Sequence, residues 1–318
     1  QIVRNEDDLM FYDSMGEVTI NVWRYFGEVL PYWIEQSGHR GHNEIDPEWD
    51  LERILAEDTR GIDGLRKDFG QGLPPQAMEY IINRTHSVKW NFVFMSESLD
   101  GGEVTYRSSR HFAVLNENIV FPLSAANTAP DYRNIFEERR TAYGLSLVLL
   151  NNLSHDERPY DDPWQALIRY ATVSTNDGSP MIMYGQEIGA ASLNENTGIG
   201  SWDYYELNFG KNIPHFKKWN SMQPQWNAWN ANELGVRFLR PVYAAIGQAR
   251  EFSPALRSPN RWFLNRQSDG FVRNEIFSVA KYSEPNVPLP FQDVVLAFTN
   301  LDRFNLQADT FRVSNDLA

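Results

Sequence analysis

The chain has 318 residues, of which 42% are hydrophobic, and its formal net charge is −13 at pH 7. This length allows one large domain and a small one, and the acidic charge argues against nucleic acid and anionic membrane surfaces as partners. The chain has no cysteine, which excludes disulfides and thiolate catalysis, and it has no run of about 18 apolar residues that would predict a membrane span.

Strands and helices alternate through the first 250 residues. Apolar residues at helical spacing predict a helix over 17–36, kinked at Pro31, and Pro74-Pro75 opens another over about 75–86. Further helices are predicted near 49–55 and over 130–143, 163–175 and 232–250, and strands over 61–68, 89–97, 110–116, 145–151 and 179–185. This alternation indicates a parallel sheet.

The pattern changes after Pro259. Short strands separated by turns, without helices between them, are predicted over 261–266, 276–282, 294–300 and 310–313. This is typical of a small antiparallel β domain. We therefore expect two domains, residues 1–255 and residues 256–318.

Three acidic residues lie where predicted strands stop. Asp68 ends the first strand, Glu97 ends the second, and Asp156 follows the fourth. In a β/α barrel the carboxyl ends of the strands gather on one face, which holds the active site. Three carboxylates that converge there could cleave a glycosidic bond, although any one of them alone is more often a helix cap.

The residues around these acids resemble four segments of the α-amylase family of glycoside hydrolases. Residues 64–68 (GLRKD) resemble its G-x-R-x-D segment, and 94–97 (FMSE) resemble its acid/base segment. Residues 154–156 (SHD) are similar to its N-H-D segment, and 179–189 (SPMIMYGQEIG) to its last barrel strand with the following loop. The four segments occur in the family's order, and the resemblance extends from about residue 17 to the end.

The resemblance implies a fold class and a missing part. It implies the C-terminal part of a (β/α)8 TIM barrel, about strands 4 to 8, followed by a small antiparallel β-sandwich domain, whole or incomplete. The family's D-x-x-x-N-H segment on the third strand has no counterpart here. An open half barrel would expose an unpaired edge and an apolar core, so we expect another chain or a longer precursor to supply the N-terminal half.

The resemblance also assigns roles to individual residues. It implies that Asp68 is the nucleophile, Glu97 the general acid/base and Asp156 the group that grips sugar hydroxyls and favours the distorted ring. Substrate-binding roles fall to Arg66, whose guanidinium keeps Asp68 ionised, and to His155, which donates a hydrogen bond to the same sugar. The expected activity is that of a retaining glycoside hydrolase or transglycosidase acting on α-linked glucans, namely starch, glycogen or malto-oligosaccharides. No cofactor is required for it, and a calcium ion is possible.

Two departures from the family pattern leave alternatives open. Ser154 stands where the family usually has Asn, and Lys67 stands where a small or apolar residue is more common. A catalytically silent relative that binds glucan or serves as a structural partner is therefore a second hypothesis. An unrelated α/β-barrel enzyme is a third.

Three weaker signals have a simple structural interpretation as well as a functional one. His39 and His42 could bind a metal, but a solvated loop is the simpler interpretation. The aromatic residues crowded over 202–229 could stack on a glucan or form a small core of their own. Gln186 and Glu187 are expected at the rim of the pocket.

Overall fold

The computed structural model describes residues 16–41, 47–68, 70–97, 112–116, 119–143, 146–152, 163–183, 186–188 and 235–313. Contacts divide the chain into two units, Gln1–Glu117 with Ala142–Leu147, and Asn118–Thr141 with Val148–Ala318. The domain boundary predicted near residue 255 lies within the second unit and stays a prediction. In the described ranges, no helix is both long and apolar enough to cross a membrane.

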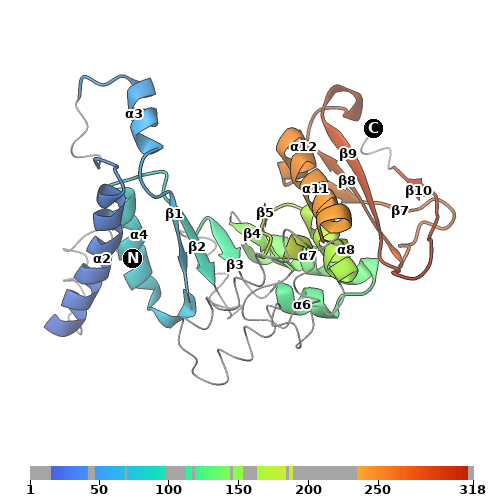
Figure 1. Ribbon diagram of the computed structural model, residues 1–318, viewed down its shortest axis with the longest axis horizontal. Helices are drawn as coiled ribbons and strands as arrows, with labels where there is room; N and C mark the ends of the chain where they lie inside the picture. Colours follow the sequence, from blue (N-terminus) through green and yellow to red (C-terminus); the bar gives the residue numbers. More distant parts are fainter. Residues whose placement is uncertain are drawn as a thin grey trace. The chain divides into compact units, whose positions relative to one another are not determined.

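Helix α2 (Glu17–Gln36) is the first described element of the first unit, and it has the predicted bounds and continues through Pro31. It lies beside α4 (Pro75–His86), as Figure 1 shows. Gly27 is required at this contact, because a Cβ atom there would lie 2.5 Å from Cε1 of Tyr80. The face of α2 that is buried contains Ile20, Gly27, Leu30, Pro31 and Ile34.

A second apolar stripe runs along α2. Six of its large apolar side chains are 44–79% exposed: Val18, Val22, Tyr25, Phe26, Tyr32 and Trp33. With 3.6 residues per helical turn, these positions fall on the side of the helix opposite the buried face. A surface helix normally carries one apolar stripe, which packs on the core. Helix α2 carries two, and the described part of its unit covers only one of them.

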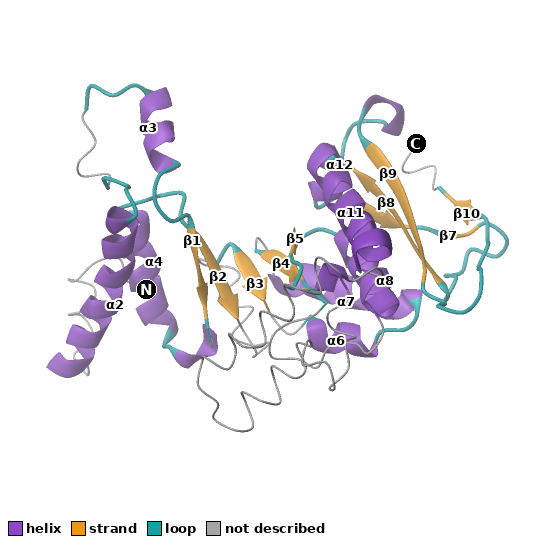
Figure 2. Cartoon of the chain, in the orientation of Figure 1, coloured by secondary structure: helices purple, strands orange, loops and turns teal. Residues whose placement is uncertain are grey.

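Three parallel strands follow in the order β1-β2-β3, drawn in orange in Figure 2. They are β1 (Gly64–Lys67), β2 (Val93–Glu97) and β3 (Val114–Asn116), and the short helix α3 (Leu51–Asp58) precedes them. One face of β2 packs against α4, since the ring of Phe94 is 1% exposed and lies 5.4 Å from that of His86.

The ammonium group of Lys89 holds the loop that leads into β1. It donates hydrogen bonds to the carbonyls of Arg60 (2.9 Å) and Ile62 (3.1 Å) and to the carboxylate of Asp63 (2.6 Å). Lys89 is fully buried, and a buried charge is tolerated only when such partners replace its water. The start of β1 is therefore fixed by a side chain that precedes β2.

The helices that follow agree with the predicted pattern, with additions. The structure has α6 (Val120–Ala125), α7 (Ala129–Tyr143), α8 (Pro163–Ser174), a π-helical turn η5 (Gly235–Leu239), α11 (Arg240–Phe252) and α12 (Pro254–Arg257). Helices α6 and α12 were not predicted. Both are short, and short apolar runs give no clear helical period.

Strands β4 (Leu147–Leu150) and β5 (Ser179–Pro180) pair in parallel, and β5 is shorter than the predicted strand over 179–185. Pro180 has no N–H to donate, and among the described residues after it only the bond from the Met181 N–H to the Leu150 carbonyl (3.2 Å) continues the ladder. Gly178 allows β5 to approach β4, because it has a φ of 146° and a Cβ there would meet the Val148 carbonyl.

The C-terminal strands form two antiparallel sheets. One has the order β6-β8-β9, and the other pairs β7 with β10. Their bounds are β6 (Arg261–Phe263), β7 (Asn265–Arg266), β8 (Ile276–Tyr282), β9 (Val294–Asn300) and β10 (Phe311–Arg312). The predicted antiparallel strands are all present, while the complete sandwich stays a prediction.

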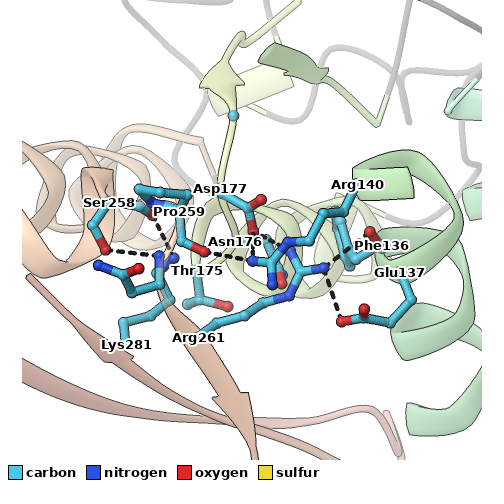
Figure 3. A network of polar contacts seen from close by, with 12 residues as sticks. Phe136, Glu137, Arg140, Thr175, Asn176, Asp177, Ser258, Pro259, Arg261 and Lys281 are labelled. Carbon is cyan, nitrogen blue, oxygen red and sulfur yellow. Dashed lines mark hydrogen bonds and ion pairs between the residues drawn. The ribbon is translucent and has the colours of Figure 1, made fainter. Parts of the chain in front are cut away.

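A network of charged side chains ties these strands to the helices of the second unit (Figure 3). The buried guanidinium of Arg261 on β6 binds Asp177, Glu137 (3.0 Å) and the Phe136 carbonyl (2.9 Å). Arg140 on α7 also binds Asp177, at 3.2 Å. One carboxylate thus joins two arginines from different elements.

Lys281 on β8 lies in this network and donates a hydrogen bond to the Ser258 carbonyl (2.7 Å). Burial lowers the pKa of Lys281 from 10.5 to about 7, and the cations of Arg261, Arg140 and Arg250 act in the same direction, while Asp177 opposes them. Unlike an exposed lysine, Lys281 therefore changes charge near neutral pH in the folded protein.

This lowered pKa makes the stability of the fold depend on pH. Between about pH 7 and pH 10.5 the unfolded chain binds a proton at Lys281 that the folded chain does not, so stability rises with pH in that window. Denaturant titrations across the window should show this rise in the wild type and a flatter profile in Lys281→Met. Arg312→Met, which removes an exposed cation from β10, should keep the wild-type slope.

Candidate active site

The register between β1 and β2 brings two acidic residues level with each other. Arg66 pairs with Met95 and Lys67 with Ser96, so Asp68 and Glu97 come next, at the carboxyl ends of the two strands. Side chains alternate along a strand, which puts Arg66 and Asp68 on one face together with Glu97. Because α4 packs on the other face, through Phe94, these three side chains lie on the face away from α4.

A single guanidinium holds both carboxylates. Nη1 of Arg66 lies 2.6 Å from Oδ1 of Asp68, and Nη2 lies 3.1 Å from Oε1 of Glu97. A guanidinium can make both bonds because its donors form a fixed planar fork. The two acids differ in exposure, at 79% for the Asp68 side chain and 15% for that of Glu97. The structure thus brings together three of the five residues singled out in the sequence.

Lys67, the unusual residue of this segment, contacts the turn that follows the strand. Its ammonium donates to the Gly70 carbonyl at 2.8 Å. By strand alternation the side chain leaves the sheet on the face opposite Arg66 and Asp68. The described contact of Lys67 therefore lies away from the face that carries Arg66, Asp68 and Glu97.

The remaining predicted site residues lie outside the described residues. These are His155 and Asp156, and the same holds for Ser154, His42 and the aromatic segment over 202–229. Their roles stay predictions. The strand that leads to them, β4, ends at Leu150, and the chain is described up to Asn152.

Two buried amide side chains lie beyond the strand ends, and the sequence pattern predicted neither of their positions. Gln186 was expected at a pocket rim, but its side chain lies in the interior, at 3% exposure, and it donates a hydrogen bond to Oδ1 of Asn152 (2.9 Å). Asn152 was given no role. Two asparagines directly after a continuous apolar strand are the signal for it, since polar side chains that enter a core need partners.

His39 is a structural histidine and not part of a solvated loop. Its exposure is 2%, its Nδ1 accepts from the Gly41 N–H (2.9 Å), and its Nε2 lies 3.2 Å from Oδ1 of Asp58. Nδ1 is an acceptor, so the proton of the neutral ring sits on Nε2 and is donated to Asp58. Trp90 donates to the other oxygen of the same carboxylate (2.6 Å). Within the described ranges, no three His, Asp or Glu side chains are placed to hold a metal ion.

No family model and no curated protein matches the sequence. Solved structures do match. A maltogenic α-amylase from Thermotoga neapolitana aligns with a TM-score of 0.55 at 12% identity, over 88% of this chain and 53% of its own. An α-amylase from Anoxybacillus aligns with a TM-score of 0.53 at 14% identity, over 90% and 62%.

A cyclic α-maltosyl-(1→6)-maltose hydrolase from Arthrobacter globiformis, solved with maltose, also matches, with a TM-score of 0.54 at 14% identity, over 90% of this chain and 61% of its own. The chain has an α-amylase-type fold. It spans only between half and two thirds of the length of these structures. The predicted resemblance is thus confirmed at the level of the fold, for a part of the α-amylase architecture.

One distance tests the retaining mechanism that the sequence analysis expects. If the chemistry proceeds with retention of configuration, the carboxyl groups of Asp68 and Glu97 should lie about 5 to 5.5 Å apart. A crystal structure of the protein with a bound malto-oligosaccharide would measure this separation. A value of about 6.5 to 9.5 Å would indicate an inverting arrangement and would contradict double displacement.

Proposed function

We propose that this protein is a retaining glycosidase or transglycosidase that acts on α-linked glucans, namely starch, glycogen or malto-oligosaccharides. The observation that carries the proposal is the Arg66 guanidinium, which binds Asp68 and Glu97 at the ends of two neighbouring parallel strands. The α-amylase-type fold supports the choice of substrate. In such folds the carboxyl ends of the strands hold the active site.

In the proposed first step, Glu97 donates its proton to the glycosidic oxygen while a carboxylate oxygen of Asp68 attacks the anomeric carbon. The bond between that carbon and the leaving sugar breaks, and the sugar remains on Asp68 as an ester. In the second step, Glu97 takes a proton from the acceptor hydroxyl, which attacks the same carbon and releases Asp68. Water as the acceptor gives hydrolysis, and a sugar hydroxyl gives transfer.

The other residues bind and orient in this proposal. Arg66 directs Asp68, because one nitrogen of its guanidinium binds that carboxylate and the other is anchored on Glu97. Asp156 and His155 grip the hydroxyls of the donor sugar and favour its distorted ring. These two roles come from the family resemblance alone.

The proposal includes further strands from another chain or from sequence beyond this one. Two features of the first unit support it: the Asp68 side chain is 79% exposed, and α2 carries an apolar stripe that its described surroundings leave bare. Moreover, β1 pairs with β2 alone among the described strands. Three parallel strands added at the free edge of β1, with their helices, would cover the stripe and exclude water from Asp68.

Replacing Glu97 by Gln tests the assignment of the acid. The variant cannot protonate the leaving group, so activity on natural glucans should fall by about 10² to 10⁴-fold, while substrates with very good leaving groups should keep part of theirs. Both rates are measured on the complete protein, with Glu138→Gln, an exposed acid of α7, as the control. Equal losses on both kinds of substrate, or no loss on either, would show that Glu97 is not the acid, and a wild-type protein without activity on either would favour a catalytically silent protein.

The chain purified alone tests the proposed missing strands. With the stripe of α2 bare, it should self-associate or unfold without a cooperative transition, as seen by size exclusion and calorimetry. Replacing Tyr25 and Trp33 by Lys should reduce this association, whereas Thr19→Lys, on an exposed polar position of α2, should leave it unchanged. A cooperative, monomeric and fully active chain would show that no further strands are needed.

A further inference from the structure

A groove lies on the face of β9 that the short strand β10 covers only in part. Strand β10 pairs with β7 over two residues, whereas β9 is seven residues long. Leu296 and Phe298 stand at alternate positions of β9, so they share one face, and they are 47% and 50% exposed. These side chains and the segment 307–313 line the groove, whose volume of about 530 Å³ is in the range of small-molecule sites.

The base of the groove is apolar and buried. Leu264 and Ile276, which line it, are 1% and 6% exposed. Leu264 forms a buried cluster with Ala280, and Phe311 packs against that cluster. The ring of Phe311 lies 5.1 Å from that of Phe298, at an interplanar angle of 48°. The groove thus presents aromatic rings on a base that belongs to the core.

Two amide side chains also line the groove, and hydrogen bonds hold both of them in place. The amide of Asn300 accepts from the Asp302 N–H and donates to the Asn305 carbonyl, both at 2.9 Å. The amide of Gln307 donates to the Asp302 carboxylate and accepts from the Arg273 guanidinium, both at 2.8 Å. An amide group has two N–H donors and two lone pairs, so each of these can bind a ligand without leaving its anchor.

The carboxylate of Asp302 fixes the turn that carries these amides. It accepts hydrogen bonds from the backbone N–H groups of Phe304 (2.9 Å) and Asn305 (3.1 Å) as well as from Gln307. These bonds, with that from Phe304 first, lower the pKa of Asp302 to about 2, so the carboxylate stays charged at neutral pH. The polar side of the groove is therefore formed before any ligand binds, which reduces the entropy lost on binding.

The charges at the groove favour a neutral ligand that carries hydroxyl groups. Arg273 lies 3.1 Å from Glu275 and 3.7 Å from Asp309, so its positive charge is balanced. Asp309 lines the groove and adds a carboxylate, which repels anions and accepts hydrogen bonds from hydroxyls. An apolar chain segment in the groove would instead bury this carboxylate and the amides without new partners, which is costly.

We propose that this groove is a carbohydrate-binding site, built from residues that take no part in the candidate active site, and that it binds glucose units of an α-glucan. A pyranose ring has apolar C–H faces and a rim of hydroxyls, which match aromatic rings beside fixed polar groups. The ring of Phe298 stacks on a C–H face, and Asn300, Gln307 and Asp309 bind the hydroxyls. The carbohydrate class follows from the groove, whereas the choice of an α-glucan rests on the proposed function.

Hydrogen exchange locates the binding of a glucan without any assay of activity. In the complete protein carrying Glu97→Gln, which slows cleavage, maltoheptaose should slow amide exchange in residues 307–313. In that background Phe298→Tyr keeps an aromatic ring and should keep this protection. Phe298→Leu keeps an apolar contact without the ring, and the affinity measured from the protection should fall by about tenfold or more.

Phe304→Leu is the matched control. It makes the same change in a ring that is 83% exposed and does not line the groove, so it should keep the affinity of the protein with Phe298. Both positions are at the surface, so the melting temperatures of the variants should stay close to that of the wild type.

Kinetics shows what the groove adds to the proposed activity. Phe298→Leu should leave kcat on a short soluble malto-oligosaccharide unchanged, because Phe298 contacts no reacting group. On starch granules below saturation its rate should fall by about 3- to 10-fold, because a second binding site on the same molecule raises the effective concentration of the polymer. Phe304→Leu should match the wild type on both substrates.

The outcomes separate this inference from the proposed function. If the protein cleaves α-glucans but maltoheptaose leaves residues 307–313 unprotected, or protects them equally in Phe298→Leu and Phe298→Tyr, the inference alone is wrong. If Phe298→Leu changes the elution volume in size exclusion but not the binding of maltoheptaose, the groove is a protein-docking face and the inference is again wrong. If the protein cleaves no α-glucan and the ring-dependent protection is still seen, the proposed function fails and the carbohydrate site stands.

Discussion

The parallel register between β1 and β2 is the constraint on which the candidate site depends. It sets Arg66 beside Met95 and so brings Asp68 level with Glu97 on the face away from α4. A slip of one residue would turn one of the two carboxylates toward the helix and break the pair of bonds made by Arg66. The register is secured from outside the site, by the Lys89 ammonium that holds the loop before β1 and by the Phe94 ring buried beneath α4.

In both units of the chain, arginine guanidinium groups connect segments that are separate in the sequence. Arg66 joins the ends of two strands, and Arg261 joins β6 to α7 and to Asp177 in the loop after α8. Arg250, on α11, donates to the carbonyls of Asn176 and Gly178, both at 3.0 Å. A planar fork with several donors suits this task better than an ammonium, because one side chain can satisfy acceptors on separate segments. Lys281 lies among these arginines, and its ammonium group is the one that loses its proton near neutral pH.

Local sequence patterns were sufficient to predict much of this architecture. Helical spacing gave the bounds of α2, and apolar runs located β1, β2 and β4, so that Arg66, Asp68 and Glu97 could be identified from strand ends and a motif. The same patterns failed for His39 and Gln186, which are buried by partners distant in sequence. Periodicity reports which face of an element is apolar, but not which polar side chain will find a partner inside. The strand at β5 was predicted, but its early end was not, because an apolar run does not reveal where Pro180 interrupts a ladder.

The bare stripe of α2 has a consequence for the life of the protein in a cell. Exposed aromatic side chains such as Tyr25 and Trp33 are what chaperones and quality-control proteases bind on incompletely folded chains. A copy whose stripe stays exposed would be held by chaperones or degraded by proteases, whereas a copy whose stripe is covered would not be bound by either. If another chain supplies the proposed strands, the abundance of this chain would follow the supply of that partner, and an excess of the chain alone would not accumulate.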